Sequence, residues 1–483
     1  MDLLLITPLA VCVALGLITA LARQAWLNRL SGVLAAAVVL ASGLAISTQV
    51  LAGHTLTALG GLLRADALTA FMLTAIGAVG LTATWGGLAA RDVVKRGAYA
   101  YPVLLVGFLL AMSLAVLADN LGILWIAIEA TTITTAFLVG HHRTRQALEA
   151  AWKYVILGSV GVAIALLGIV LLYSATVAAG SPTLSWVSLM HSGGTLDHGL
   201  VKMAAGLTLL GFATKAGLAP MHSWLPDAHS QAPAEVSGLM SGVLLSVAFY
   251  GILRVQAITN QVLGPTLMRS LLIAGALLSI AQAGALIMRQ RDLKRMLAYS
   301  SIEHMGIIAL GAAIGGPLAI GAALLHMLGH GLAKSSIFVA SGRILAADGT
   351  TKIAQLRSLL ARRPAVAAPF LVAMMALLGM PPFALFFTEV TIIVAGFQRG
   401  LGWVTGAAVA LLLVAFIGLA HHSADLLFGG REAAAEEADI DRSWHGPRVP
   451  LIAALAVTAM LGFVAGPTAD LIARAAQLLG TGQ

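Results

Sequence analysis

The sequence has very few charged residues and a single cysteine. Asp, Glu, Lys and Arg make up 10% of the 483 residues, whereas a soluble globular domain carries roughly a quarter. Hydrophobic residues make up 59%. The one cysteine, Cys12, lies within an apolar run, so a disulfide framework and a cysteine-ligated metal or iron–sulfur centre are excluded. The composition predicts an all-α, polytopic membrane protein, and any redox chemistry is expected elsewhere.

Signals for soluble cofactors and for nucleic acid are also lacking. The sequence shows no nucleotide-binding loop and no flavin or dinucleotide fingerprint. The formal charge of +8 comes from basic residues in short connectors rather than on one basic face, which argues against nucleic acid as a partner. We therefore expect no cofactor in this chain, and the energy for any transport must come from partner subunits or an ion gradient.

Long apolar runs dominate the chain. A membrane helix needs about 20 apolar residues, and the sequence predicts fourteen such spans. The first run lacks a positive n-region and a small-residue cleavage site, so it is expected to be a helix and not a signal peptide. The predicted spans are 1–22, 30–52, 66–90, 100–118, 120–140, 151–175, 200–219, 234–257, 266–288, 296–314, 317–342, 364–397, 402–427 and 449–472.

The basic residues predict the orientation. Nineteen of the 28 Lys and Arg residues lie in the connectors after odd-numbered spans, for example Arg91, Lys95 and Arg96, and only six lie on the other side. Cytoplasmic loops carry the excess of positive charge. Both termini are therefore expected on the non-cytoplasmic side of a bacterial or archaeal cell membrane. The mixed-charge connector 431–448 is expected to be a solvated loop or a subunit contact.

Two spans are interrupted by glycine and proline. The seventh breaks at Gly217–Pro220 and the twelfth at Gly379–Pro382, and proline removes a helix hydrogen bond. Broken helices at matching places in two halves indicate an inverted-repeat transporter. The sequence predicts two five-helix repeats, spans 4–8 and 9–13. The chain then divides into four parts, which are 1–99, 100–257, 258–430 and 431–483.

Ionisable residues inside the predicted spans are the functional candidates, because a charge at the membrane centre costs roughly 2.5–3.5 kcal/mol. Acids, lysines and histidines on different spans are typical of a proton path. Two alternatives without a role in transport remain. In one, Lys215 lies at a helix end and extends its ammonium group to the membrane interface. In the other, Lys153 forms a surface ion pair with Glu149. The candidates are Glu129, Lys153, Lys215, His304, His326, His330, Lys334 and Glu389.

Three candidates follow one face of the eleventh span. His326, His330 and Lys334 are spaced i, i+4 and i+8. A His-x-x-x-His pair can bind zinc, but the ammonium group would oppose a cation and no glutamate neighbours the pair. The pattern favours a proton relay over zinc or ordinary buried histidines, and no metal is predicted. Glu303, beside His304, is expected closer to the surface.

Several segments together resemble a known family. They are KAGLAPMHSWLPDAHSQAP, RMLAYSSIEHMGI, HGLAKSSIFVASG, the Glu129 span and the interrupted span with Glu389. They resemble the antiporter-like subunits of respiratory complex I, membrane-bound hydrogenases and multi-subunit sodium/proton antiporters. ADNLGILWIAIEATTITTAFLVG followed by ALEAAWKYVILGSVG is most similar to component F of the hydrogenase-4 and formate-hydrogenlyase type. The resemblance implies proton translocation coupled to a peripheral hydrogenase or dehydrogenase module, with no catalysis by this chain.

The resemblance also implies residue roles. Glu129 and Lys215 would form the coupled pair of the first half, Lys334 and His304 the central relay, and Glu389 the exit-side group. One residue departs from the pattern, because Ser246 stands where complex I members carry a lysine. Water or His330 would then bridge from Lys215. A sodium/proton antiporter subunit, another ion carrier and an intramembrane haem or quinol enzyme stay open as alternatives.

Overall fold

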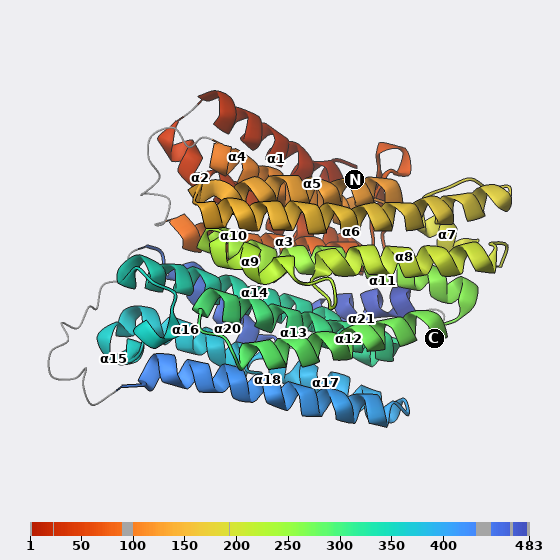
Figure 1. Cartoon of the computed structure of the whole chain (residues 1–483). Helices are drawn as coiled ribbons and strands as arrows, with labels where there is room; N and C mark the ends of the chain where they lie inside the picture. Colours follow the sequence, from red (N-terminus) through yellow and green to blue (C-terminus); the bar gives the residue numbers. More distant parts are fainter. Residues whose placement is uncertain are drawn as a thin grey trace.

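The chain folds as a bundle of long helices that run side by side along one common direction (Figure 1). The computed structural model describes residues 2–22, 24–88, 100–192, 194–430, 446–463 and 467–480. The predicted basic connector with Arg91, Lys95 and Arg96 lies outside the described residues, as does most of the charged connector 431–448.

The first half contains helices and one short antiparallel strand pair, β1 (Leu56–Ala58) with β2 (Leu63–Ala65). Its helices are α1 (Asp2–Ala22), α2 (Ala25–Leu51), α3 (Ala67–Gly86), α4 (Ala100–Leu117), α5 (Leu121–Val139), α6 (Arg145–Ala178), α7 (Trp186–His191), α8 (His198–Ala216), α9 (Trp224–Gln231), α10 (Ala234–Leu239) and α11 (Leu245–Leu263). A π-helical turn, Met240–Leu244, joins α10 to α11.

The second half is helical throughout its described residues, apart from connecting turns. Its helices are α12 (Thr266–Ile287), α13 (Leu293–Ile314), α14 (Gly316–Asp348), α15 (Leu359–Arg362), α16 (Pro364–Leu377), α17 (Ala384–Gln398), α18 (Gly402–Phe428), α20 (Val449–Met460) and α21 (Pro467–Gly480).

The described residues contain eleven helices long and apolar enough to cross a membrane. The other three predicted spans have a different form. Span 200–219 corresponds to α8, which carries lysines near both ends, 364–397 divides into α16 and α17, and 449–472 divides into α20 and the start of α21. The protein is therefore a multi-pass helical membrane protein.

Both predicted interruptions are present. Helix α8 ends at Ala216 and is capped by Gly217, whose φ of +74° is a left-handed conformation that glycine adopts without strain. A Cβ at this position would lie 2.4 Å from Leu225, so the break also packs tightly. The second break follows α16, where Gly379 has φ +60° and a Cβ would lie 2.7 Å from the Glu389 carboxylate.

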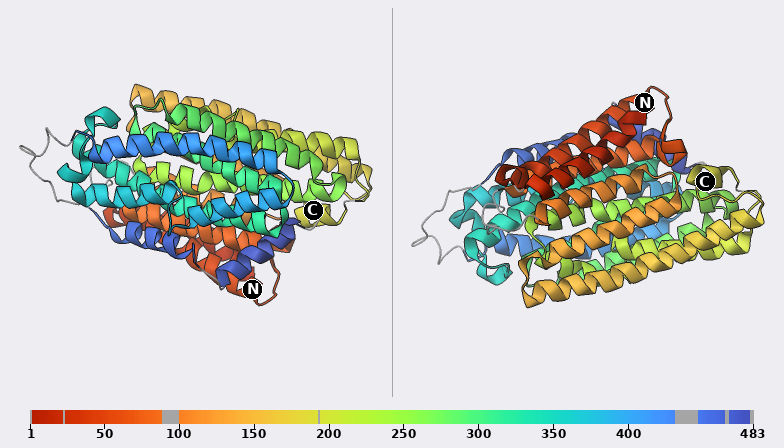
Figure 2. Two further views of the ribbon diagram at one scale, coloured as in Figure 1. Left: turned by 90° about the horizontal axis from the view of Figure 1, so that it is seen from below. Right: turned by 90° about the horizontal axis from the view of Figure 1, so that it is seen from above.

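The most buried helices lie in the middle of the bundle. The most apolar stretches of α10–α11 and α13 consist entirely of buried residues, whereas buried residues make up 22% of the corresponding stretch in α1 and 33% in α18. Helix α1 and helix α18 lie on opposite outer faces (Figures 1 and 2). Glu303, His304, His326, His330 and Lys334 on α13 and α14 are consequently buried inside the bundle.

Candidate functional site

Lys215 sits in a closed polar cluster between α5, α6 and α8. It lies in the last turn of α8 and its side chain is fully buried. The ammonium group donates to Thr132 Oγ1 at 2.7 Å and to the Tyr154 hydroxyl. Tyr154 shares a further hydrogen bond of 2.6 Å with Thr135. The alternative that Lys215 snorkels to the interface is therefore wrong.

Glu129 connects to this cluster through a hydroxyl group. The half-buried Glu129 accepts from Ser159 Oγ at 2.6 Å and from Thr132 Oγ1 at 3.1 Å. Thr132 lies three residues after Glu129, so both side chains are on one face of α5. One hydroxyl thus donates to the carboxylate and accepts from the Lys215 ammonium group, which links the two charges without a direct ion pair in the described residues.

Lys334 is the second fully buried lysine. It lies on α14 and donates to the Leu297 carbonyl at 2.8 Å and to Ser300 Oγ, both on α13. His330, one turn earlier on α14, packs its ring 4.9 Å from that of His304. Neither ring nitrogen of His330 has a hydrogen-bond partner among the described residues.

Two histidines continue from this point toward Glu389. His304 Nδ1 and His326 Nε2 are 3.1 Å apart, and His326 Nδ1 is 2.8 Å from Thr388 Oγ1. Thr388 directly precedes Glu389 on α17. An imidazole ring can donate at one nitrogen and accept at the other. The side chains of α13, α14 and α17 therefore form a hydrogen-bonded series that ends beside Glu389.

A divalent ion is a weaker interpretation of the same side chains. His304, His326 and Glu389 each offer a ligand atom within 4.8 Å of the others, so the expectation that no glutamate neighbours the histidines is wrong. Both ring nitrogens of His326 are already hydrogen-bonded, however. The tilted rings of His304 and His326, with centroids 5.2 Å apart, also leave no space for a haem. The cluster fits a proton relay better.

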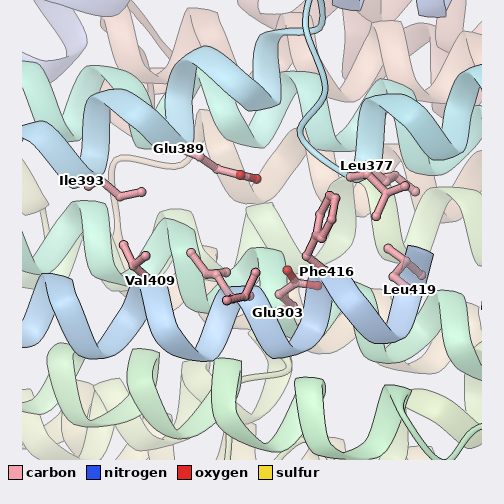
Figure 3. A pocket seen from close by; sticks show the side chains of 10 residues that line it. Glu303, Leu377, Glu389, Ile393, Val409, Phe416 and Leu419 are labelled. Atoms are coloured by element: carbon pink, nitrogen blue, oxygen red, sulfur yellow. The ribbon is translucent and has the colours of Figure 1, made fainter. Parts of the chain in front are cut away.

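Glu303 and Glu389 face a cavity of about 230 Å³ between α13, α16, α17 and α18. In Figure 3, Glu389 extends into this space from α17 and Glu303 lies across from it. Glu303 is 8% exposed, so the expectation that it lies closer to the surface is wrong. Neither carboxylate accepts a hydrogen bond from the described residues. The remaining lining side chains are apolar.

Aromatic rings and one histidine lie between the two lysine clusters. The Tyr154 ring is 4.8 Å from that of Trp224, and His229 lies 6.2 Å from Trp224 and 5.8 Å from Phe338, one turn after Lys334. His229 is fully buried and its Nε2 has no partner among the described residues. Ser246 is also buried, with a hydroxyl that lacks a partner there.

Lys153 lies apart from the buried clusters. Its side chain is 48% exposed and pairs with Glu149 at 2.7 Å and with Asp227 at 3.1 Å. Asp227 also accepts from Arg295 at 2.6 Å. The structure thus places Lys153 in the surface ion pair that its spacing from Glu149 allowed, and the adjacent Tyr154 on the buried side of α6.

The sequence interpretation left three polar residues of this region out of its candidates, Tyr154, His229 and Glu303, and it placed Glu303 nearer the surface. Tyr154 is next to Lys153 and Glu303 is next to His304, and those neighbours were the stronger candidates. His229 lies within residues 215–233, which were interpreted together as one motif. Successive helix residues lie about 100° apart, so an exposed Lys153 signals that Tyr154 points elsewhere. Helix α13 is buried all round, so no periodicity in its sequence distinguishes Glu303 from a surface acid.

Known proteins are similar to this chain in sequence and in fold. A family model described as "NADH:quinone oxidoreductase/Mrp antiporter, TM" matches residues 118–415. The hydrogenase-4 component F homolog of Methylacidiphilum infernorum is 41% identical over 296 residues, which are 60% of this chain and 62% of that protein, so the match spans less than two thirds of the relative. An Na(+)/H(+) antiporter subunit of Alkalihalophilus pseudofirmus is 28% identical over 84% of this chain and 81% of its own length.

A solved structure agrees with these relatives. A chain of respiratory complex I from Thermus thermophilus superposes with a TM-score of 0.74 and 26% identity, covering 94% of this chain and 96% of that one. The matched family region contains every candidate residue from Glu129 to Glu389. The resemblance seen in the residues is confirmed, and this chain belongs to the family of antiporter-like membrane subunits of NADH:quinone oxidoreductases and Mrp antiporters.

Proposed function

We propose that this chain is the proton-translocating membrane subunit of a redox-driven complex of the hydrogenase-4 or NADH:quinone oxidoreductase type. The chain catalyses no reaction and binds no cofactor of its own. A hydrogenase or dehydrogenase module, together with further membrane subunits, supplies the energy. The observation that carries the proposal is the pair of fully buried lysines, each hydrogen-bonded to polar side chains on neighbouring helices. Buried charges of this kind mark ion pathways.

The first half responds to the electrostatic state of the neighbouring module. A charge change in the neighbouring module weakens the attraction between Glu129 and Lys215. Loss of a nearby negative charge makes a buried ammonium group easier to deprotonate. Lys215 then releases its proton, and the hydroxyls of Thr132 and Tyr154 hold the amine in place during the exchange.

The second half passes the proton on. His229 lies between the two lysine clusters and offers a ring nitrogen for a water-mediated link in place of the lysine that Ser246 replaces. Lys334 receives the proton, the histidines His304 and His326 conduct it with His330 alongside, and Glu389 releases it. Each step moves one proton between groups that are joined by a hydrogen bond or by water.

The membrane architecture belongs to the same proposal. Fourteen spans are arranged as two inverted five-helix repeats, spans 4–8 and 9–13, within the divisions 1–99, 100–257, 258–430 and 431–483. The broken spans at Gly217 and Gly379 support this reading. The membrane is that of a bacterial or archaeal cell, with both termini on the non-cytoplasmic side.

Replacing Lys215 with Met tests the function. Met fills a similar volume without a charge, so proton pumping by the complex in proteoliposomes should be abolished while electron transfer stays at least partly active. Lys202→Met is the matched control, because Lys202 lies on the same helix with an exposed side chain. Normal pumping by Lys215→Met, with the control intact, would overturn the proposal.

Sodium is the second candidate ion, favoured by the similarity to an Na(+)/H(+) antiporter subunit over 84% of the chain. The residues themselves serve either cation, because carboxylates bind sodium as well as protons. Sodium uptake into the same vesicles decides between them. Uptake that needs Lys215 and persists without a pH gradient would favour sodium, whereas sodium-independent acidification supports protons.

A further inference from the structure

Two acids that accept no hydrogen bond from the described part of the chain face a cavity that is otherwise apolar. The cavity walls besides Glu303 and Glu389 come from Leu, Ile, Val and Phe side chains. An unpaired carboxylate in such surroundings is costly, and it is stabilised by taking a proton or by contact with water or a cation. No ion pair within the described residues involves Glu303, so a structural salt bridge does not explain it.

Glu303 stands close to the Lys334 end of the histidine series. Ser300, which accepts from Lys334, lies one turn before Glu303 on α13, and His304 is the next residue. Glu303 therefore lies within one helical turn both of the residue that binds Lys334 and of the residue that contacts His326. On helix α13, Ser300 thus contacts Lys334, His304 contacts His326, and Glu303 faces the cavity.

The cavity is large enough to conduct. Its volume of about 230 Å³ holds several water molecules, each of which takes roughly 30 Å³ in the liquid. The carboxylates supply the polar partners that such waters need. Val409, Leu413 and Phe416 of α18 line the cavity and are also 40–57% exposed, so the cavity lies close to the outer face of the bundle.

We propose that Glu303 carries protons along a second branch, parallel to the histidines, from Lys334 through the water-filled cavity to Glu389. This inference rests on the proposed function and adds a residue to it. The Lys334 ammonium group gives its proton to the Glu303 carboxylate, which leaves a neutral amine and a carboxylic acid. The acid passes the proton through water to the Glu389 carboxylate, and Lys334 is reprotonated from the first half.

The first test compares glutamate variants by pumping in proteoliposomes. Glu303→Gln keeps the shape and removes the titratable group, so pumping should fall several-fold, while Glu303→Asp should retain most of it. Glu149→Gln is the matched control, since it makes the same chemical change in an exposed ion pair and should pump normally. Wild-type pumping by Glu303→Gln would overturn the second branch.

The second test needs no pumping. A lipid-soluble carbodiimide attacks protonated carboxyl groups in apolar surroundings, and mass spectrometry of the α13 and α17 peptides separates Glu303 from Glu389. Glu303 should be modified in the intact complex, and more so in Lys334→Met, because removal of the positive charge favours the protonated acid. An unmodified Glu303 in both proteins would contradict the proposal even if Glu303→Gln failed to fold.

The two proposals fail in different ways. If Lys215→Met pumps normally, the proposed function falls, whatever carbodiimide does at Glu303. If Lys215→Met is inactive while Glu303→Gln pumps at the wild-type rate, the second branch falls and the histidine series stands alone.

Discussion

The two fully buried lysines are held by different chemistry. Lys215 is surrounded by hydroxyl groups, and its acid, Glu129, is one hydroxyl away. Lys334 is held by a carbonyl and a single serine, and beyond it lie three histidines and two acids. A hydroxyl group rotates to donate or accept but seldom takes a charge, whereas histidine changes charge near neutral pH. The first cluster is therefore suited to holding a charge pair and the second to conducting.

The difference also extends to burial. Glu129 is half-buried on α5, near the outer face, whereas Glu303 is 8% exposed inside the bundle. A neighbouring subunit can act electrostatically on the first acid at short range, because field strength falls with distance and with screening. We infer that the signal from a partner enters at α5, and that the second cluster responds to Lys215.

Among the variants other than Lys215→Met, Lys334→Met should have the largest effect. If the conducting cluster depends on this single ammonium group, pumping should fall by about tenfold or more, which corresponds to roughly 1.4 kcal/mol in the barrier. Vesicle acidification at matched electron-transfer rates measures it. A loss much smaller than that of Lys215→Met would show that protons bypass the second lysine.

Tyr154→Phe should have the next largest effect. The change removes one of the two side-chain acceptors of the Lys215 ammonium group, and a hydrogen bond to a charged group is worth about 1.5–3 kcal/mol. Thr135 loses Tyr154 but still donates to the Thr131 and Thr132 carbonyls. Pumping should fall several-fold and the thermal midpoint of the subunit should drop. Unchanged pumping would mean that Thr132 alone positions the ammonium group.

Ser300→Ala is the corresponding change in the second cluster. Lys334 keeps the Leu297 carbonyl, which is a stronger acceptor than a hydroxyl group, so the cost should lie near the lower end of about 1.5–3 kcal/mol, the value of a hydrogen bond to a charged group. Pumping should decline less than in Tyr154→Phe when the two variants are assayed side by side. The reverse order would contradict the idea that the first cluster depends more on fixed hydroxyl partners.

The smallest expected effect belongs to Asp227→Asn outside both clusters. Asp227 joins α9 to Lys153 of α6 and Arg295 of α13, and partly exposed ion pairs contribute about 0–1 kcal/mol each. Stability should fall by about 1 kcal/mol, and less at high salt because screening already weakens the pairs. Pumping should be retained, so a pumping defect would place Asp227 inside the mechanism.

Much of the fold followed from simple physical signals. Apolar runs located the long helices, and glycine and proline located both breaks, because these residues act on the backbone wherever the chain goes. The cost of a charge in the membrane identified Lys215 and Lys334 as buried. These inferences need only local sequence and a known solvent.

Contacts between side chains that lie far apart in the sequence were much less predictable. His326 and Thr388 are 62 residues apart in sequence, yet His326 Nδ1 lies 2.8 Å from Thr388 Oγ1. No local sequence pattern indicates a contact between residues so far apart. Glu303 and His304 are adjacent on a helix buried on all sides, so amphipathicity could not show which one faces the cavity. Tyr154 was not considered because the neighbouring Lys153 is charged and drew attention as a candidate, although the two side chains point in different directions.

Proton-to-electron stoichiometry in proteoliposomes tests most directly whether the two clusters form one path. It should be measured for the wild type, for Lys215→Met, for Lys334→Met and for the double variant. One continuous path predicts that each single variant and the double variant fall to the same low ratio. Partial losses that add in the double variant would show two independent routes and would contradict the account.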